Sequence, residues 1–308
     1  MRLTRRTFGK LAAASAAAFA LPGRAMAAAA APMPPGAVDT HIHIMGPQAK
    51  YPYAATRVYS PPEASVDDLR ALRPRLGVVR NVIVTPSVYG FNNDVTVDAI
   101  AALQGTARGV AVLPPDVPAR ELGPLEAYGI RGTRLNTGLP DLKEQLTAFA
   151  PKFKPLNWHV QIVGQIQMIL GLSSQIAGLG IPVVLDHFGG ARGEDGVQNR
   201  DFQALLELVK AGNTYVKLSA PYDRTKEPGY ASMTPFARAL IAARPDRMLW
   251  GTNWPHPSQD RSIPITQVSP YQNVDNEMLV RRLMDWCPDG EMRRAILVDN
   301  PVRLYRFS

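Results

Sequence analysis

The hydrophobic pattern of this chain alternates between short apolar runs and longer segments in which apolar residues recur at three- and four-residue spacing. Runs of the first kind are typical of buried β-strands, and segments of the second kind are typical of amphipathic helices. The pattern predicts strands at residues 38–45, 79–85, 109–113, 130–136, 159–163, 182–187, 215–219 and 247–252. It predicts helices at residues 66–76, 95–104, 166–179, 202–210 and 235–243, and two closing helices at 273–286 and 290–305.

Eight strands in alternation with helices predict an α/β fold, a single-domain (β/α)8 TIM barrel over residues 37–308. A doubly wound sheet is the main alternative, but no Gly-x-Gly-x-x-Gly fingerprint follows the first predicted strand. Catalytic groups of such barrels lie at the C-terminal ends of the strands and in the loops that follow. Polar residues at those positions are therefore the candidates for chemistry.

Residues 1–27 have the features of a twin-arginine signal peptide. A twin-arginine pair precedes an Ala-rich apolar stretch at residues 11–21, and residues 25–27 form a small-x-small cleavage site. The apolar stretch is too short to cross a bilayer, which takes about 20 residues. We therefore expect export by the twin-arginine machinery to the periplasm, a leader at residues 28–36, and no stable membrane span after cleavage.

The basic character of the chain depends largely on this segment. Removal of residues 1–27 takes away five basic residues and no acid, so the formal charge falls from +8 to +3. The remaining Lys and Arg are scattered, which gives no electrostatic basis for nucleic-acid binding. Cys287 is the only cysteine, so an intramolecular disulfide is excluded.

The five histidines fall on or just after predicted strands, and this placement suggests one active site. Asp39, His41 and His43 alternate along the first predicted strand, so their side chains are expected on one face. A His-x-His pair by itself is also consistent with structural histidines bonded to backbone carbonyls. His187, which ends the sixth predicted strand, adds a third imidazole to the expected site.

Other polar residues follow the same strand ends and are candidates for substrate binding. Arg131 and Arg134 are three residues apart on the fourth strand, so only one of them is expected to point into the barrel mouth. A guanidinium there suits bidentate capture of a carboxylate, and Arg224 after the seventh strand would add a second clamp. The remaining candidates are hydrogen-bonding side chains, namely Ser87, Tyr89, Asn92, Gln161 and His256.

The order of these motifs resembles the amidohydrolase superfamily and, within it, the amidohydrolase-related branch that includes 2-pyrone-4,6-dicarboxylate lactonase and D-galactarolactone isomerase. The resemblance spans residue 38 to the C-terminus. It rests on the motifs Asp39-Thr40-His41-Ile42-His43, Pro86-Ser87-Val88-Tyr89-Gly90, Gly129-Ile130-Arg131-Gly132-Thr133-Arg134-Leu135-Asn136, Trp158-His159-Val160-Gln161, Leu185-Asp186-His187-Phe188-Gly189 and Trp250-Gly251-Thr252-Asn253-Trp254-Pro255-His256. The resemblance implies a TIM-barrel hydrolase that opens a carboxylated lactone, a cyclic ester.

Asn253 departs from the pattern of this family, in which the eighth strand usually ends in an aspartate that binds a metal or acts as general base. An amide cannot accept a proton at neutral pH, so Asn253 cannot replace that base. The lactonase branch implies catalysis without a metal or other cofactor, and His41, His43 and His187 would then polarise the carbonyl. The alternative is a divalent metal such as zinc on those same three histidines.

Three functions remain open on these residues. In the first, water opens an acidic lactone, with a histidine or Asp39 as base. In the second, a hydroxyl of the substrate attacks, and the enzyme is an isomerase that moves the ester between hydroxyls of a sugar diacid; Asn253 suits this reaction because an amide can orient a hydroxyl. In the third, the barrel is a non-catalytic periplasmic protein that binds carboxylates.

Overall fold

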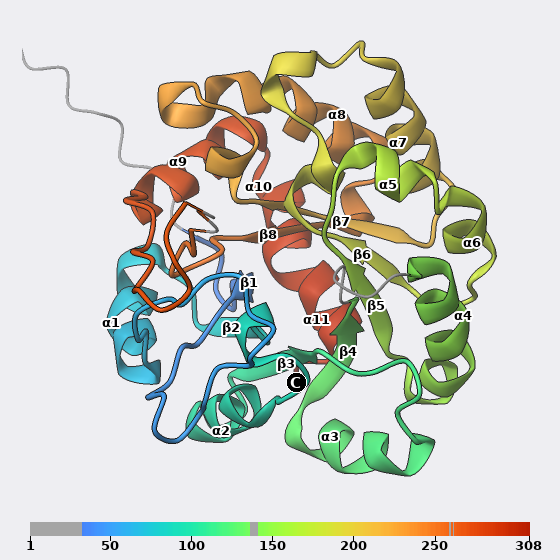
Figure 1. Cartoon of the computed structure of the whole chain (residues 1–308). Helices are drawn as coiled ribbons and strands as arrows, with labels where there is room; N and C mark the ends of the chain where they lie inside the picture. The colour runs from blue at the N-terminus through green and yellow to red at the C-terminus, as the bar shows by residue number, and fades with distance from the viewer. Residues whose placement is uncertain (1–32, 136–140, 259, 261) are drawn as a thin grey trace, which may run out of the picture. The chain divides into compact units, whose positions relative to one another are not determined.

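The computed structural model describes residues 33–135, 141–258, 260 and 262–308. Within these residues, eight parallel strands follow one another in sequence order around a nearly closed barrel, as the pattern predicted (Figure 1). The strands are β1 Val38–Ile42, β2 Arg80–Val84, β3 Ala107–Ala111, β4 Ile130–Arg134, β5 His159–Ile162, β6 Val183–Leu185, β7 Thr214–Ser219 and β8 Met248–Gly251. The predicted signal peptide at 1–27, most of the predicted leader, and Asn136 lie outside the described residues.

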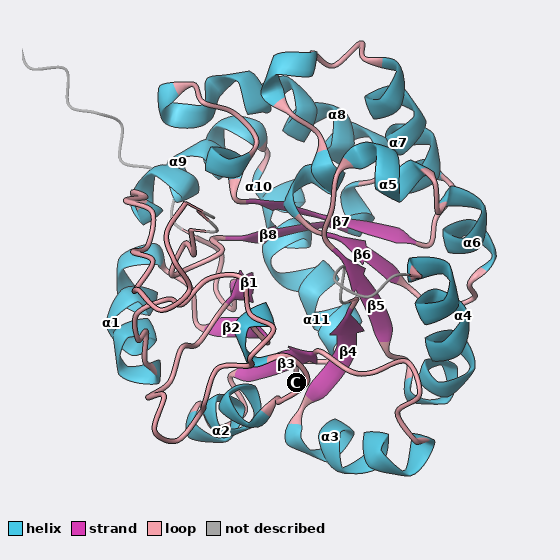
Figure 2. Ribbon diagram, in the orientation of Figure 1, coloured by secondary structure: helices cyan, strands magenta, loops and turns pink. Residues whose placement is uncertain are grey.

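Helices surround the strands (Figure 2). Those that precede the last strand are α1 Val66–Leu76, α2 Asp94–Ala102, α3 Leu122–Tyr128, α4 Leu142–Phe153, α5 Ile166–Leu170, α6 Ser173–Gly178, α7 Arg200–Lys210 and α8 Thr234–Ala243. The closing helices are α9 Asn276–Trp286, α10 Gly290–Arg294 and α11 Asn300–Tyr305. Among the described residues, no helix combines the length and apolar character needed to cross a bilayer.

The helices differ from the prediction in four places. The single helix expected at 166–179 is divided into α5 and α6, and a π-helical turn at Ala295–Asp299 separates α10 from α11. The pattern did not predict α3 and α4. Each contains a proline, Pro124 or Pro151, which weakens the helical signal although α4 buries one complete face.

The C-terminal residues cover the interior of the barrel from one end. Tyr305 and Phe307 pack in one buried cluster with the inward side chains Val38, Val82 and Leu249. The ring of Tyr305 also stands edge-on against His159 at 5.2 Å between centroids. Because α11 occupies this end, the polar residues that follow the strands lie at the opposite end.

The barrel closes where β1 meets β8, and we call this contact the β1–β8 seam. Oδ1 of Asp39 accepts hydrogen bonds from the backbone N–H of His41 (3.1 Å) and of Thr252 (3.0 Å), and Oδ2 accepts from the Thr252 hydroxyl (2.6 Å). Gly251 permits the close approach, since a Cβ there would lie 2.7 Å from the backbone nitrogen of His41. Beyond the strands, backbone bonds from Asn253 N–H to His41 and from His43 N–H to Trp254 continue the pairing.

The seam predicts a specific pH dependence of stability. Burial raises the pKa of Asp39 from 3.8 to about 6. An acid whose folded pKa is raised favours the fold while it is protonated, so wild-type stability should fall as the pH rises from about 4 through 6. Asp39→Asn keeps an acceptor for the two N–H donors and removes the charge. It should therefore gain up to about 3 kcal/mol relative to wild type across that interval, measured by urea unfolding at several pH values.

The control for this comparison is Asp67→Asn, because the Asp67 side chain is 85% exposed. The free energy of unfolding of Asp67→Asn should change with pH in the same way as that of wild type. A constant difference between Asp39→Asn and wild type from pH 4 to pH 7 would contradict the buried charge.

Candidate functional site

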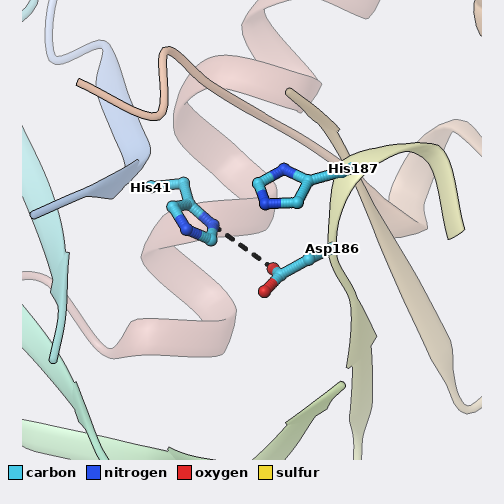
Figure 3. A group of neighbouring side chains, drawn as sticks. All are labelled: His41, Asp186 and His187. Carbon is cyan, nitrogen blue, oxygen red and sulfur yellow. Dashed lines mark ion pairs between the residues drawn. The ribbon is translucent and has the colours of Figure 1, made fainter. Parts of the chain in front are cut away.

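His41, Asp186 and His187 form the centre of a polar cluster at the C-terminal end of the strands (Figure 3). His41 lies on β1, and the other two residues directly follow β6. Nδ1 of His41 lies 3.2 Å from Oδ1 of Asp186, and the two imidazole centroids are 4.8 Å apart. Burial lowers the pKa of both histidines well below the usual value, so both rings are neutral at physiological pH.

Unusual backbone conformations occur where the chain leaves β6 and β8. His187 and Phe188 have φ values of 51° and 59°, and Asn253 and His256, after β8, have φ values of 63° and 68°. Left-handed conformations cost free energy in residues other than glycine, and they concentrate at functional sites. Two separate strand ends therefore carry backbone strain.

Lys217 on β7 also belongs to the cluster, and sequence analysis did not identify it. Its ammonium is fully buried, 3.3 Å from Nδ1 of His41, 2.8 Å from Oε1 of Gln161 and 3.7 Å from Oδ1 of Asp186. Burial lowers the pKa of Lys217 to about 8. The available signal was a lysine within an otherwise strand-like run, because such a charge is buried only with partners.

The three clustered histidines are all held through Nδ1. His43 contacts the carbonyl oxygen of Val84 (2.7 Å), His41 contacts Lys217, and His187 contacts the hydroxyl of Ser219 (2.9 Å). Because a carbonyl only accepts, Nδ1 of neutral His43 carries the proton, and its Nε2 has a free lone pair. Burial and the charge of Arg134 lower the pKa of His43 to about 3, so this ring is neutral as well.

Arg134 is the arginine of β4 that joins the site. It donates to the carbonyl oxygen of Thr85 (3.2 Å), and its charge acts on His43, on Asp186 and on the buried Tyr59. Burial raises the pKa of Tyr59, and the nearby hydroxyl of exposed Ser87 opposes this shift. Arg134, Tyr59 and Ser87 therefore provide donors for an anionic group beside the histidines; Tyr59 was not predicted.

Arg131 does not join this group. Its guanidinium donates to the backbone oxygens of Glu126 (2.9 Å) and Ile130 (2.8 Å) and forms an ion pair with the Glu126 carboxylate, which Arg306 shares. These residues lie at the N-terminal end of β4, away from the strand end that carries Arg134. The prediction that Arg131 binds substrate is therefore corrected to a structural role.

Tyr89 and Asn92 are engaged in local structure. The hydroxyl of buried Tyr89 accepts from the backbone N–H of Gly46 (3.1 Å), and its ring stands against Tyr53. Exposed Asn92 accepts from the backbone N–H of Asp94 (2.8 Å) at the start of α2. These contacts support the loops after β1 and β2, and they do not place either polar group in the histidine cluster.

Gln161 and Arg224 reach the cluster in different ways. The Gln161 amide bridges Lys217 and Asp186, with Nε2 donating to Oδ2 of Asp186 at 2.9 Å, so its side chain orders the cluster. Arg224 lies near His187, whose pKa its charge lowers. Over the described part of the chain, the buried Nε of Arg224 has no hydrogen-bond partner, so Arg224 stays a candidate for binding an anion.

Asn253 ends a chain of hydrogen bonds that runs back to α9. Its Nδ2 donates to the Tyr222 hydroxyl (2.9 Å), Tyr222 contacts Nδ1 of His256 (3.0 Å), and Nε2 of His256 contacts Oδ1 of Asn276 (3.1 Å). An acceptor at Asn276 places the His256 proton on Nε2, so Tyr222 donates to Nδ1 and accepts from Asn253. Oδ1 of Asn253 is buried without a partner in the described residues, and it remains available as an acceptor.

Asp39 does not have the geometry of a general base. Both of its oxygens accept hydrogen bonds within the β1–β8 seam. Asp186, and not Asp39, is the carboxylate beside the His41 ring. The expectation of a catalytic role for Asp39 is thus replaced by a role in closing the barrel.

A divalent metal does not fit the residues of the cluster. The candidate ligand set in the structure is His41, Asp186 and His187, in which Asp186 takes the place predicted for His43. Zinc would suit such nitrogen and oxygen donors. However, the buried Lys217 ammonium contacts His41 and lies 3.7 Å from Asp186, so a dication on these ligands would face a desolvated positive charge.

Comparisons with known proteins agree on one family. The amidohydrolase family model matches residues 38–307. Two relatives are 35% identical: 4-sulfomuconolactone hydrolase of Hydrogenophaga intermedia, with 89% of each chain covered, and 2-pyrone-4,6-dicarboxylate hydrolase of Comamonas testosteroni, with 89% of this chain and 91% of the relative covered. A solved structure of a probable 2-pyrone-4,6-dicarboxylic acid hydrolase of Acinetobacter baumannii, with citric acid bound, has a TM-score of 0.75 at 26% identity and covers 88% of this chain and all of its own.

The position of Lys217 predicts how the cluster responds to metal. We expect chelator-treated wild-type protein to bind Zn²⁺ at least about tenfold more weakly than Lys217→Met, because the substitution removes the like charge from the ligand set. Isothermal titration calorimetry measures both affinities. His187→Gln in the Lys217→Met background should lose the added affinity, and tight binding of one Zn²⁺ by wild type would contradict the misfit.

Proposed function

The chain belongs to the amidohydrolase family, and on that premise we propose that it is an enzyme that hydrolyses a carboxylated lactone without a metal ion. The observation that carries the proposal is the combination of three buried neutral imidazoles with the Arg134 guanidinium at one end of the barrel. Imidazoles can polarise an ester carbonyl, and a guanidinium can hold a carboxylate. The names of the relatives at 35% identity support the same substrate class.

The acidic groups of the substrate are assigned to the cationic side of the site. Arg134, with Tyr59 and Ser87 beside it, would hold the carboxylate, and Arg224 is placed to hold a second acidic group near His187. Citric acid in the related Acinetobacter structure supports a site that accepts polycarboxylates. With its acidic groups held there, we expect the lactone carbonyl to lie among the imidazoles.

The attacking water is assigned to Asn253 and His43. The unpartnered Oδ1 of Asn253 accepts a hydrogen bond from the water, and the lone pair on Nε2 of His43 takes its second proton. The water oxygen bonds to the carbonyl carbon, the ring C–O bond breaks, and the proton passes from His43 to the departing oxygen. A carboxylate bound at Arg134 offsets the charge that lowers the pKa of His43, so substrate binding strengthens the base.

A lactone isomerase is the second candidate function, and Asn253 favours it. The same Oδ1 could orient a substrate hydroxyl in place of water, and the ester would then move between oxygens without net hydrolysis. Hydrolysis comes first because the relatives with the higher identity are named as hydrolases.

Export to the periplasm is also part of the proposal. The twin-arginine pair, the short apolar stretch and the small-x-small site at residues 1–27 support it. The mature enzyme would then begin with the leader at residues 28–36 and act outside the cytoplasm on an acidic lactone.

Proton NMR of purified, chelator-treated protein with a panel of carboxylated lactones tests the function. We expect the open acid to appear with wild type and to appear at least about 100-fold more slowly with Asn253→Ala, which removes the acceptor for water. A new lactone isomer without open acid would move the assignment to the isomerase. Tight binding without any turnover would instead indicate the non-catalytic carboxylate-binding barrel.

The two arginines of β4 provide a matched test of carboxylate binding. Arg134→Met should raise KM for a carboxylated lactone by about 10- to 100-fold, because it removes a charge-assisted hydrogen bond to the substrate. Arg131→Met should leave KM within about twofold, since that guanidinium pairs with Glu126. Steady-state kinetics of both variants decides, and an equal rise in KM would contradict the different placements of the two side chains.

A further inference from the structure

Lys217 is a buried lysine to which the proposed hydrolysis assigns no role. It is the lysine in the middle of β7, its side chain is 0% exposed, and it lies between Gln161, His41 and Asp186. A buried ammonium is costly unless it is paired and hydrogen-bonded. Its retention beside the candidate catalytic histidines calls for a role in the reaction.

We propose that Lys217 is a positioning residue that holds His41 as a hydrogen-bond donor toward the substrate carbonyl. The inference deepens the proposed function and rests on it, because the carbonyl is that of the lactone. Lys217 contacts no reacting atom and acts only through the His41 ring.

The direction of the hydrogen bonds around Lys217 carries the first step. Nε2 of Gln161 donates to Asp186, so its Oε1 faces Lys217 and accepts from the ammonium. An ammonium only donates, so Nδ1 of His41 at 3.3 Å is also an acceptor. The single proton of the neutral ring then resides on Nε2.

The position of Asp186 supports the same assignment. Its Oδ1 lies 3.2 Å from Nδ1 of His41, yet it accepts no hydrogen bond from any residue that the structure describes. The His41 ring is therefore not aligned as a donor to this carboxylate. Asp186 serves instead as the countercharge of Lys217, 3.7 Å from its ammonium.

Nε2 of His41 is free to act on a ligand. This atom is buried and has no hydrogen-bond partner among residues 33–135, 141–258, 260 and 262–308. An N–H at this position can donate to the oxygen that becomes negative when the carbonyl is attacked, as in an oxyanion hole. Lys217 thus keeps the proton of His41 on Nε2, where it can donate a hydrogen bond to the oxyanion.

His43 has the opposite polarity, and the two rings lie 5.1 Å apart. The Val84 carbonyl places the His43 proton on Nδ1 and leaves Nε2 as an acceptor. One imidazole is therefore set to take a proton from the nucleophile, and the neighbouring imidazole is set to hold the carbonyl oxygen. The hydrogen-bond partner of Nδ1 in each ring decides whether its Nε2 accepts or donates.

Loss of the Lys217 charge should reverse the tautomer of His41. In Lys217→Met, no ammonium donates to Nδ1, and Asp186 remains at 3.2 Å from that atom. The proton should move to Nδ1 and bond to the carboxylate, so Nε2 becomes an acceptor and repels the carbonyl oxygen. We expect kcat to fall by about 100- to 1,000-fold, as for loss of one oxyanion donor, with KM within about threefold.

The experiment is ¹⁵N NMR of histidine-labelled protein at neutral pH, because ring-nitrogen shifts distinguish the two tautomers. The His41 signals are identified as those missing from His41→Gln. We expect His41 protonated on Nε2 in wild type and on Nδ1 in Lys217→Met. Lys210→Met, at an exposed lysine on α7 that pairs with Glu207, is the matched control and should change neither tautomer nor kcat.

The wild-type spectrum is decisive even if Lys217→Met does not fold. His41 protonated on Nδ1 in wild type would overturn the inference, as would an unchanged tautomer in Lys217→Met together with loss of kcat, which would make Lys217 purely structural. Absence of turnover on every lactone would defeat the proposed function while the spectrum still reports the tautomer, so the two failures are distinguishable.

Discussion

Closure of the barrel at the β1–β8 seam is the constraint on which the site depends. The first and last strands are separated by about two hundred residues, and the Asp39 carboxylate joins them through Thr252. The absence of a side chain at Gly251 lets the strands meet at this distance. An open sheet would expose two unpaired edges. Because the seam joins β1 to β8, the backbone of Asn253 on one side is hydrogen-bonded to that of His41 on the other.

Beside the seam lies a buried polar cluster that hydrophobic burial alone would not produce. Lys217, Gln161 and Asp186 form a connected set in which the ammonium and the carboxylate compensate one another. Such pairs seldom increase stability over apolar residues of similar size, because the desolvation of both charges opposes their attraction. Burial lowers the pKa of Lys217, and such a perturbed pKa is characteristic of functional sites. We therefore explain the cluster by its chemistry, because its hydrogen bonds order the imidazole of His41.

The candidate site could be predicted where a residue's role follows from its place along a strand. The alternation of the first strand and the strand-end position of His187 identified three histidines. In the structure, the rings of His43 and His187 both lie against the ring of His41, and Arg134 lies near His43. Sequence also indicated that only one of Arg131 and Arg134 would enter the mouth, because three residues in a strand reverse the face. It could not identify which one, since that depends on the orientation of the strand relative to Glu126 and Arg306.

The sequence by itself determined the barrel, the order of its strands and the three histidines of the site, because hydrophobic periodicity and strand ends are local properties of the chain. Tertiary structure alone decided which atoms of those residues are free. The lysine of β7 contacts a histidine of β1, and the amide after β8 is held through Tyr222 and His256. Proton positions on imidazoles and amides follow from such long-range partners, and no local pattern contains them.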